Sequence, residues 1–307
     1  MRNIIDSELA SIVTLLIFLA ILPTSLSTYG VRTLSVGLLY GLAAVGFNIL
    51  YGYTGLISFG HAMFFSAGAY GLAIGLVKMG LDPVQSLLMA LGLTFIVAII
   101  TGYLSLRHTE IYFAMLTLAF AQLMYSLILK LRDVTGGDEG IYNIPRLLGS
   151  VESYYYLILS IVSIMVILAW WLVRTPMGLS FQTVRDNPDR ARALGINVSR
   201  VRLLSYVISA YYVSLSGILY APLHRAITPE IAYWTFSALI VMMTILGGSR
   251  RVIGAFIGGL IFIYINTFAT GFTEFWQLIM GVLLAAIVYL APNGLVGFIE
   301  GVVRRVR

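Results

Sequence analysis

Few side chains in this sequence could carry out catalysis, and those that could do other chemistry gather in one polar segment. Residues 174–202 read RTPMGLSFQTVRDNPDRARALGINVSRVR and hold six of the 17 arginines. Cysteine is absent, which excludes disulfides and thiolate chemistry. The two lysines, Lys78 and Lys130, lie outside any GxxxxGK[ST] loop, and HExxH and GxSxG are missing, so we expect neither an enzyme nor a bound metal or cofactor. The segment therefore indicates recognition through charge.

A short helix is predicted inside this segment from its end signals. Asn187 suits the N-cap, Pro188 suits the first helical position, and Asp189 lies where the helix dipole favours an anion. Gly195 can end the helix in a left-handed conformation. We expect about two turns over Asp189–Leu194, which is too short to be stable without packing against something.

The predicted helix has a small apolar surface with charges on either side. Ala191, Ala193 and Leu194 form the surface, flanked by Arg190 and Arg192. One interpretation is a helix on the membrane surface whose arginines contact lipid headgroups. The other is a docking helix that fits a groove on a cytoplasmic protein. The residues alone leave both open.

The rest of the chain has the composition of a polytopic membrane protein. Of its 307 residues, 60% are hydrophobic and only 10% are charged, and the mean hydropathy is +0.95. Long apolar runs predict helices that span the bilayer, because a helix satisfies its own backbone hydrogen bonds in lipid. The net charge of +6 is then a topology signal in loops, and no nucleic-acid partner is expected.

Hydropathy predicts an all-α bundle of ten spans, with eight to ten true crossings. The first run, up to residue 26, lacks a cleavage pattern and is kept as a mature span. The segment Gly52–Tyr70 is rich in glycine and serine, so a broken or re-entrant helix is an alternative there. The predicted spans are 9–27, 33–51, 57–77, 84–105, 111–129, 154–173, 203–222, 232–247, 252–270 and 275–291.

Orientation follows from the arginines, which favour the cytoplasmic side of a membrane. If residues 174–202 are cytoplasmic, counting spans in both directions places both termini on that side. The loop 131–153 is then external, and its four acidic residues outnumber its two arginines. The other basic residues that fall on the cytoplasmic side are Arg107, Arg250, Arg251, Arg304, Arg305 and Arg307.

Polar side chains within the predicted spans are candidates for function. All 13 acidic residues lie in loops or at span ends, with Glu110 and Glu274 nearest the core, which weakens a proton-driven mechanism. His61 is the one histidine placed inside a span. We favour a hydrogen bond to a neighbouring helix over substrate contact for His61, and treat Asn48 in the same way.

Several motifs together resemble the LivM-type permeases of branched-chain amino-acid ABC importers. The run GYTGLISFGHAMFFSAGAY at 52–70 is similar to that family's signature, and DNPDRARALGIN at 186–197 is similar to its cytoplasmic loop. The resemblance covers roughly residues 33–296. It is also carried by Ser209-Ala210, Ser216-Gly217, Thr135-Gly136-Gly137, Gly140-Ile141, Gly247-Gly248-Ser249 and Ile253-Gly254-Ala255.

The resemblance implies a single permease domain in the cytoplasmic membrane, with 174–202 as the coupling loop. It implies two cytoplasmic ATPase subunits, a second homologous permease and an external substrate-binding protein as partners. The family pattern E-x-A-A-R-A-x-G differs here, since Asp189 stands at the acidic position. The residues expected to couple to the ATPases are Asp186, Asn187, Asp189, Arg190, Ala191, Arg192 and Gly195. The candidates for the pathway or a helix break are Asn48, Gly55, Ser58, Gly60, His61, Phe64 and Gly68.

Other functions stay open on the sequence. Related permeases of the superfamily resemble importers of urea and short amides. A stand-alone secondary carrier is a different class, which would need no ATPase and could dispense with the arginine loop. A structural or signalling membrane protein would have no cavity near the midplane.

Overall fold

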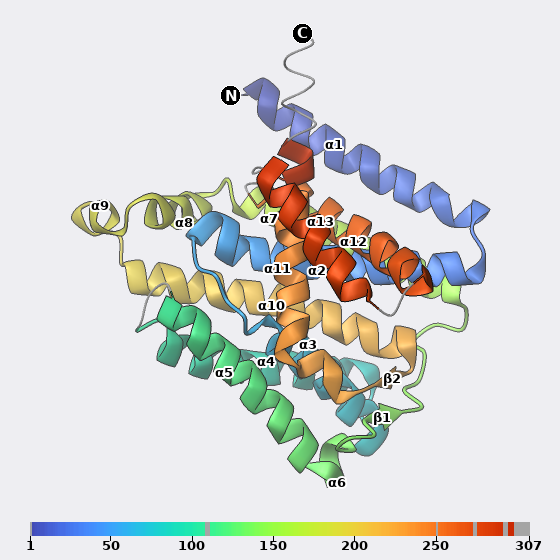
Figure 1. Ribbon diagram of the computed structural model, residues 1–307. Helices are drawn as coiled ribbons and strands as arrows, with labels where there is room; N and C mark the ends of the chain where they lie inside the picture. The colour runs from blue at the N-terminus through green and yellow to red at the C-terminus, as the bar shows by residue number, and fades with distance from the viewer. Residues whose placement is uncertain (1, 108–110, 250, 273–274, 291–293, 298–307) are drawn as a thin grey trace.

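The chain folds into layers of long helices, some of which lie side by side while others cross them steeply (Figure 1). This computed structural model describes residues 2–107, 111–249, 251–272, 275–290 and 294–297. Several residues used above for topology therefore lie outside the described part: Glu110, Arg250, Glu274, Arg304, Arg305 and Arg307.

Apart from the loop 131–153, the elements follow one another with short connections, as expected for helices that run back and forth through a bilayer. The longer helices are α1 (Arg2–Ile21), α2 (Thr28–Thr54), α3 (His61–Ala73), α4 (Pro83–Ser105), α5 (Ile111–Lys130), α7 (Val151–Leu172), α8 (Pro176–Asp186), α10 (Val198–His224), α11 (Trp234–Gly247), α12 (Val252–Phe272) and α13 (Trp276–Leu290). The short elements are η1 (Leu22–Ser25), a π-helical turn η2 (Ile74–Lys78), α6 (Arg132–Thr135), β1 (Ile141–Tyr142), α9 (Pro188–Ala193), β2 (Ala226–Ile227) and η3 (Pro229–Ala232).

The prediction of an all-α membrane bundle is confirmed. Within the described residues, seven helices are long and apolar enough to span a membrane, namely α1 with η1, α2, α4, α5, α7, α10 and α12. The apolar helix α11 is shorter, as are α3 and α13. The predicted single span 57–77 is wrong at its start, because residues 55–60 are not helical and α3 begins only at His61.

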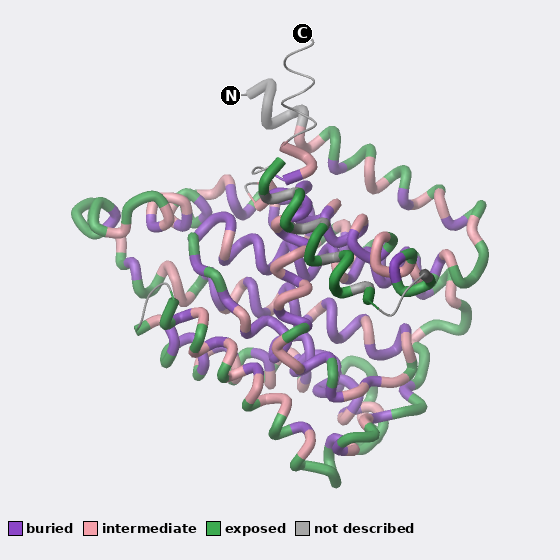
Figure 2. The backbone as a smooth tube through the Cα atoms, viewed as in Figure 1, coloured by how far each residue is buried: buried purple, intermediate pink, exposed green. Residues whose placement is uncertain are grey.

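The helices α2 and α10 form the centre of the bundle. In Figure 2 both are largely buried, whereas α1 and α5 have exposed positions that recur along their length. The helix α2 packs against α7, α10, α11 and α12, and α3 packs between α4 and α10. Many of the exposed side chains on the outer helices are apolar, among them Phe95, Ile96 and Ile100 on α4 and Ile111 and Met115 on α5. Apolar side chains on the outside of a bundle are what lipid contact requires.

The two ends of the bundle carry different structures. The helices α8 and α9 lie at one end, at the left of Figure 1, where α2 also ends. The strands β1 and β2 and the short α6 lie at the opposite end. The strands pair antiparallel, with Ile141 opposite Ile227, and so tie the loop 131–153 to the segment after α10. The orientation of these ends in the membrane stays a prediction from the arginines.

Candidate functional site: the broken helix and the arginine loop

The helix α2 is interrupted within the Gly-rich segment that the sequence singled out. It ends at Thr54, and Gly55 follows with φ of +80°, a left-handed conformation that glycine adopts without strain. The amide of Leu56 donates to the carbonyl of Leu50 at 3.2 Å, which closes the end of the helix. Residues 56–60 then run without helical structure until His61. The broken-helix alternative describes this segment, and a single continuous span does not.

Hydroxyl groups from neighbouring helices satisfy backbone amides of the interrupted segment and of the first turn of α3. The Phe59 amide donates to Thr117 Oγ1 of α5 at 3.1 Å, and the Ala62 amide donates to Ser237 Oγ of α11 at 2.8 Å. Within the segment, the Gly60 amide donates to Ser58 Oγ at 3.2 Å. Unsatisfied amides are costly away from water, so these hydroxyls make the break tolerable inside a membrane. Nothing in the sequence pattern marked Thr117 or Ser237 for this purpose.

His61 is fully buried at the start of α3 and links this helix to α10. Its Nε2 and Ser209 Oγ are hydrogen-bonded at 2.7 Å. The rings of Phe47 and Phe64 meet the imidazole edge-on, with centroids 5.0 and 5.7 Å away. The histidine therefore has the interhelical hydrogen bond favoured for it above. Ser58 and Phe64 are fully buried beside it.

Glycines bring α3 and α10 into backbone contact farther along. A Cβ atom added to Gly68 would lie 2.2 Å from the carbonyl oxygen of Ser214. A Cβ atom added to Gly217 would lie 2.0 Å from the carbonyl oxygen of Phe65. Each helix thus offers a small residue where the other presents its main chain, which allows the closest packing available to two helices.

Asn48 connects α2 to the segment before α12. It is fully buried, and its Nδ2 donates to the carbonyl oxygen of Arg251 at 3.0 Å. A Cβ atom added to Gly52 would lie 1.8 Å from the carbonyl oxygen of Ser249. The two motifs at 52–70 and 247–255, distant in sequence, therefore meet at the same end of the bundle.

The predicted loop helix is present as α9. Asn187 Oδ1 accepts from the Arg190 amide at 2.9 Å, Pro188 begins the helix, and Gly195 has φ of +82°. The helix ends at Ala193, one residue before the predicted end. The prediction from the end signals is confirmed.

The helix α9 packs by one alanine and exposes the rest of its surface. Ala191 is buried with Val184 of α8 and Val198 of α10. Leu194 is 69% exposed and Ala193 also faces outward, so these two do not pack with Ala191 as one surface. Leu194 is therefore available to a partner.

The charges of the loop pair with one another on this outward side. Asp189 forms an ion pair with Arg192, and Asp186 forms one with Arg185 at 2.9 Å. Arg190 is exposed on the same helix. Exposed pairs of this kind contribute little to stability, on the order of 1 kcal/mol or less. They are better suited to partner recognition than to holding the fold.

One side chain joins the loop to the broken helix. Arg185, near the end of α8, donates from Nη1 to the carbonyl oxygen of Gly52 at 2.6 Å. Its side chain also covers Gly55, where an added Cβ atom would lie 2.8 Å from Arg185 Cγ. The sequence prediction missed Arg185, since one arginine among six in the segment gave no sign of its partner.

A groove of about 980 Å³ opens where these parts meet. Leu56 and Phe59 of the interrupted segment line it, together with Met115 of α5. Asp189 and Arg192 of α9 line its charged side. The loop helix and the helix break therefore share one surface, and a movement of α9 would change the shape of the groove.

The described residues contain no group of three or more histidine, cysteine, aspartate or glutamate side chains that could hold a metal ion. The chemistry available at this site is hydrogen bonding, ion pairing and helix movement.

Comparison with known families assigns this architecture. Residues 29–288 match the family described as the permease component of the branched-chain amino acid transport system. The chain belongs to this family. It is therefore a multi-pass permease of the cytoplasmic membrane and the permease component of an ABC transporter, and is not itself an ATPase.

Two kinds of permease are similar to this one. The high-affinity branched-chain amino acid transport system permease protein LivM of Salmonella typhimurium is 24% identical over 92% of this chain and 74% of its own length. LivH of the same organism is 27% identical over 86% of this chain and 92% of its own length. BraD of Pseudomonas aeruginosa is 27% identical over 87% and 94%. No solved structure matches the permease.

Proposed function

We propose that this permease is one of two homologous membrane subunits of an importer that translocates branched-chain, hydrophobic amino acids. The names of its relatives support the substrate, since LivM, LivH and BraD are all permease proteins of branched-chain amino acid transport systems. One organism contains both LivM and LivH, and both resemble this chain over most of its length. This co-occurrence supports a homologous permease as the membrane partner of this chain.

The chain has no GxxxxGK[ST] motif for binding ATP, so other subunits have to supply the energy. In this proposal they are two cytoplasmic ATPase subunits. The α8–α9 loop is their docking element, and an external substrate-binding protein delivers the amino acid at the opposite end. The exposed Leu194 and the charged residues Asp189 and Arg192 form the surface that an ATPase groove would receive.

The observation that carries this mechanism is the hydrogen bond from Arg185 to Gly52. When ATP binding moves α8 and α9, Arg185 transmits the movement to the end of α2. The interrupted segment 55–60 can follow, because its Phe59 and Gly60 amides are held by the single hydroxyl groups of Thr117 and Ser58 rather than by a helix. The groove beside it would then open or close to the cytoplasm.

The test is reconstitution of the chain with a homologous permease, the two ATPases and the binding protein in proteoliposomes. We expect uptake of radiolabelled leucine that requires ATP and all the subunits. Uptake by the chain alone, driven by a sodium or proton gradient, would instead identify a secondary carrier. ATP-dependent uptake of urea or acetamide without leucine would identify the amide importer, and no uptake of any solute would identify a structural protein.

A further inference from the structure

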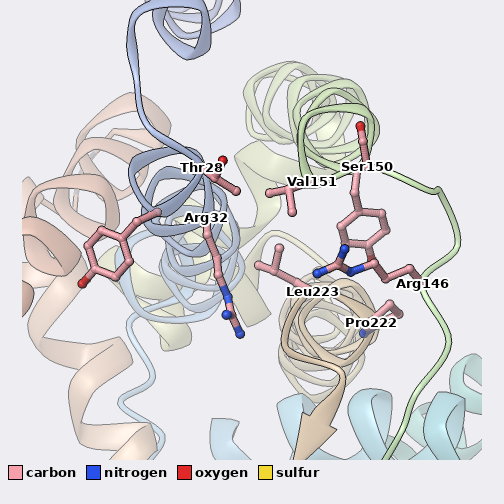
Figure 3. Close-up of a pocket in the computed structure, with 9 residues that line it drawn as sticks. Thr28, Arg32, Arg146, Ser150, Val151, Pro222 and Leu223 are labelled. Carbon is pink, nitrogen blue, oxygen red and sulfur yellow. The ribbon is translucent and has the colours of Figure 1, made fainter.

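A second pocket lies at the end of the bundle opposite α9, where α2 and α7 begin and α10 ends (Figure 3). Its volume is about 260 Å³. Pockets for drug-sized ligands usually measure about 300 Å³ or more, so this one suits a smaller molecule.

The pocket has an apolar, buried floor. Pro222 and Leu223 of α10 are buried there, and Tyr154 of α7 is 2% exposed. The Tyr154 hydroxyl donates to the carbonyl of Leu219 at 2.9 Å, so its polar atom is already bonded and its ring remains as a wall. With Val151, these residues form a surface for an aliphatic side chain.

Two arginines occupy the rim. Figure 3 shows Arg32 on α2 and Arg146 in the segment before α7, with Val151 and Leu223 between them. The lining contains no acidic side chain. Among the residues that the structure describes, neither arginine takes part in an ion pair. Two guanidinium groups without a carboxylate at one small pocket are suited to bind a carboxylate ligand, because their donors match its geometry.

The end of α10 provides the opposite charge. Pro222 and Leu223 belong to its last turn, and the carbonyl groups of a helix's last turn carry partial negative charge and accept hydrogen bonds from cations. The pocket thus combines an anion-binding rim, a cation-favouring helix end and an apolar floor.

We propose that this pocket receives an aliphatic amino acid as a zwitterion before translocation. Arg32 and Arg146 bind the α-carboxylate, the carbonyl groups that end α10 accept from the α-ammonium group, and Val151 and Leu223 contact the side chain. The inference rests on the proposed function, which places this end outside the cell. It adds a selectivity rule, since a neutral amide such as urea has no carboxylate for the two arginines.

Crosslinking with L-photo-leucine tests the pocket directly. The probe is added to the two permeases and two ATPases assembled in nanodiscs, with the binding protein left out. The adducts are mapped by mass spectrometry. We expect labelling around Val151 and Leu223 that excess leucine suppresses and excess isoamylamine, which lacks the carboxylate, does not. R32Q and R146Q should each weaken the competition by leucine about tenfold or more, as expected for a lost hydrogen bond between charged groups. R132Q, which changes an arginine of α6 outside the pocket lining, is the matched control.

Three results would overturn the inference. They are absence of labelling in the wild-type complex, equal competition by isoamylamine, and unchanged labelling in a double R32Q, R146Q variant. If that variant lost association with the binding protein and kept its labelling, the arginines would serve docking instead. Leucine uptake by the wild-type complex is a separate measurement. If uptake occurs but the pocket is not labelled, this inference is wrong and the proposed function still holds. If no leucine is taken up, the proposed function itself is wrong.

Discussion

Arg185 Nη1 lies 2.6 Å from the carbonyl oxygen of Gly52, and this hydrogen bond spans 133 positions of sequence. It joins the last turn of α8, in the charged loop, to the last turn of α2, just before the helix breaks. Gly52 is itself packed against the main chain of Ser249. The loop, the broken helix and the segment before α12 therefore form one connected unit at this end of the bundle.

Cysteine labelling can establish the orientation of this unit, because the natural chain has no cysteine to give background. Ser199→Cys lies in the first turn of α10 beside the loop, and Asp138→Cys lies in the loop at the opposite end; both positions are exposed. In intact cells, an impermeant maleimide should label Asp138→Cys and leave Ser199→Cys unlabelled until the membrane is opened. The reverse pattern would invert the topology.

Changes in α9 should weaken ATPase association. Asp189→Arg removes the ion pair with Arg192 and places like charges three residues apart. Gly195→Pro cannot keep φ of +82°, because proline fixes φ near −65°. Both variants should insert into the membrane normally and recover much less ATPase on co-purification. Asp138→Arg, a charge reversal at the opposite end, is the control, and full ATPase recovery with Asp189→Arg and Gly195→Pro would rule out docking through α9.

The bond between His61 and Ser209 should stabilise the bundle measurably. Ser209→Ala leaves His61 Nε2 buried without its partner, which should lower the free energy of unfolding by about 1 kcal/mol. Ser216→Ala is a matched control, since Ser216 Oγ donates to Tyr212 O within the same helix. Thermal unfolding in detergent compares the two. Equal melting temperatures would show that the hydrogen bond between His61 and Ser209 does not stabilise the bundle.

The contact between α3 and α10 should not tolerate a methyl group. Gly68→Ala would place Cβ 2.2 Å from the carbonyl oxygen of Ser214, and backbone on both sides prevents an easy adjustment. We expect destabilisation of about 2 kcal/mol or more and loss of monodisperse protein on size-exclusion chromatography. Gly92→Ala, in α4 with no atom within 4 Å of the added Cβ, should behave as wild type or better. A monodisperse Gly68→Ala protein would show that the helices can separate there.

The sequence predicted those features that depend on local residues. Asn187, Pro188 and Gly195 act through neighbours within a few positions, so α9 could be placed within one residue of its observed end. The apolar runs located the long helices for the same reason. The Gly-rich segment indicated a break, although its start could not be fixed, because the sequence does not show which glycine of the segment takes the left-handed conformation found at Gly55.

Contacts between distant positions could not be read in this way. Thr117 and Ser237 look like ordinary small polar residues in apolar helices, and only the fold brings them to the amides of Phe59 and Ala62. Nothing in the sequence distinguished Arg185 from the other arginines of its segment. Only the fold places Arg185 beside Gly52. Leu194 was expected to share one apolar surface with Ala191, but Ala191 is buried while Leu194 is exposed. Each case depends on which side of a helix faces a partner far along the chain.

The most direct test of the central claim is the ratio of leucine imported to ATP hydrolysed in proteoliposomes that contain the complete importer with Arg185→Gln. We expect ATPase association and hydrolysis to continue while uptake falls about tenfold or more, because the charged hydrogen bond that transmits movement has been lost. Arg200→Gln, which changes an exposed arginine of the same segment, should keep the wild-type ratio. An unchanged ratio in Arg185→Gln would contradict the coupling of the loop to the broken helix.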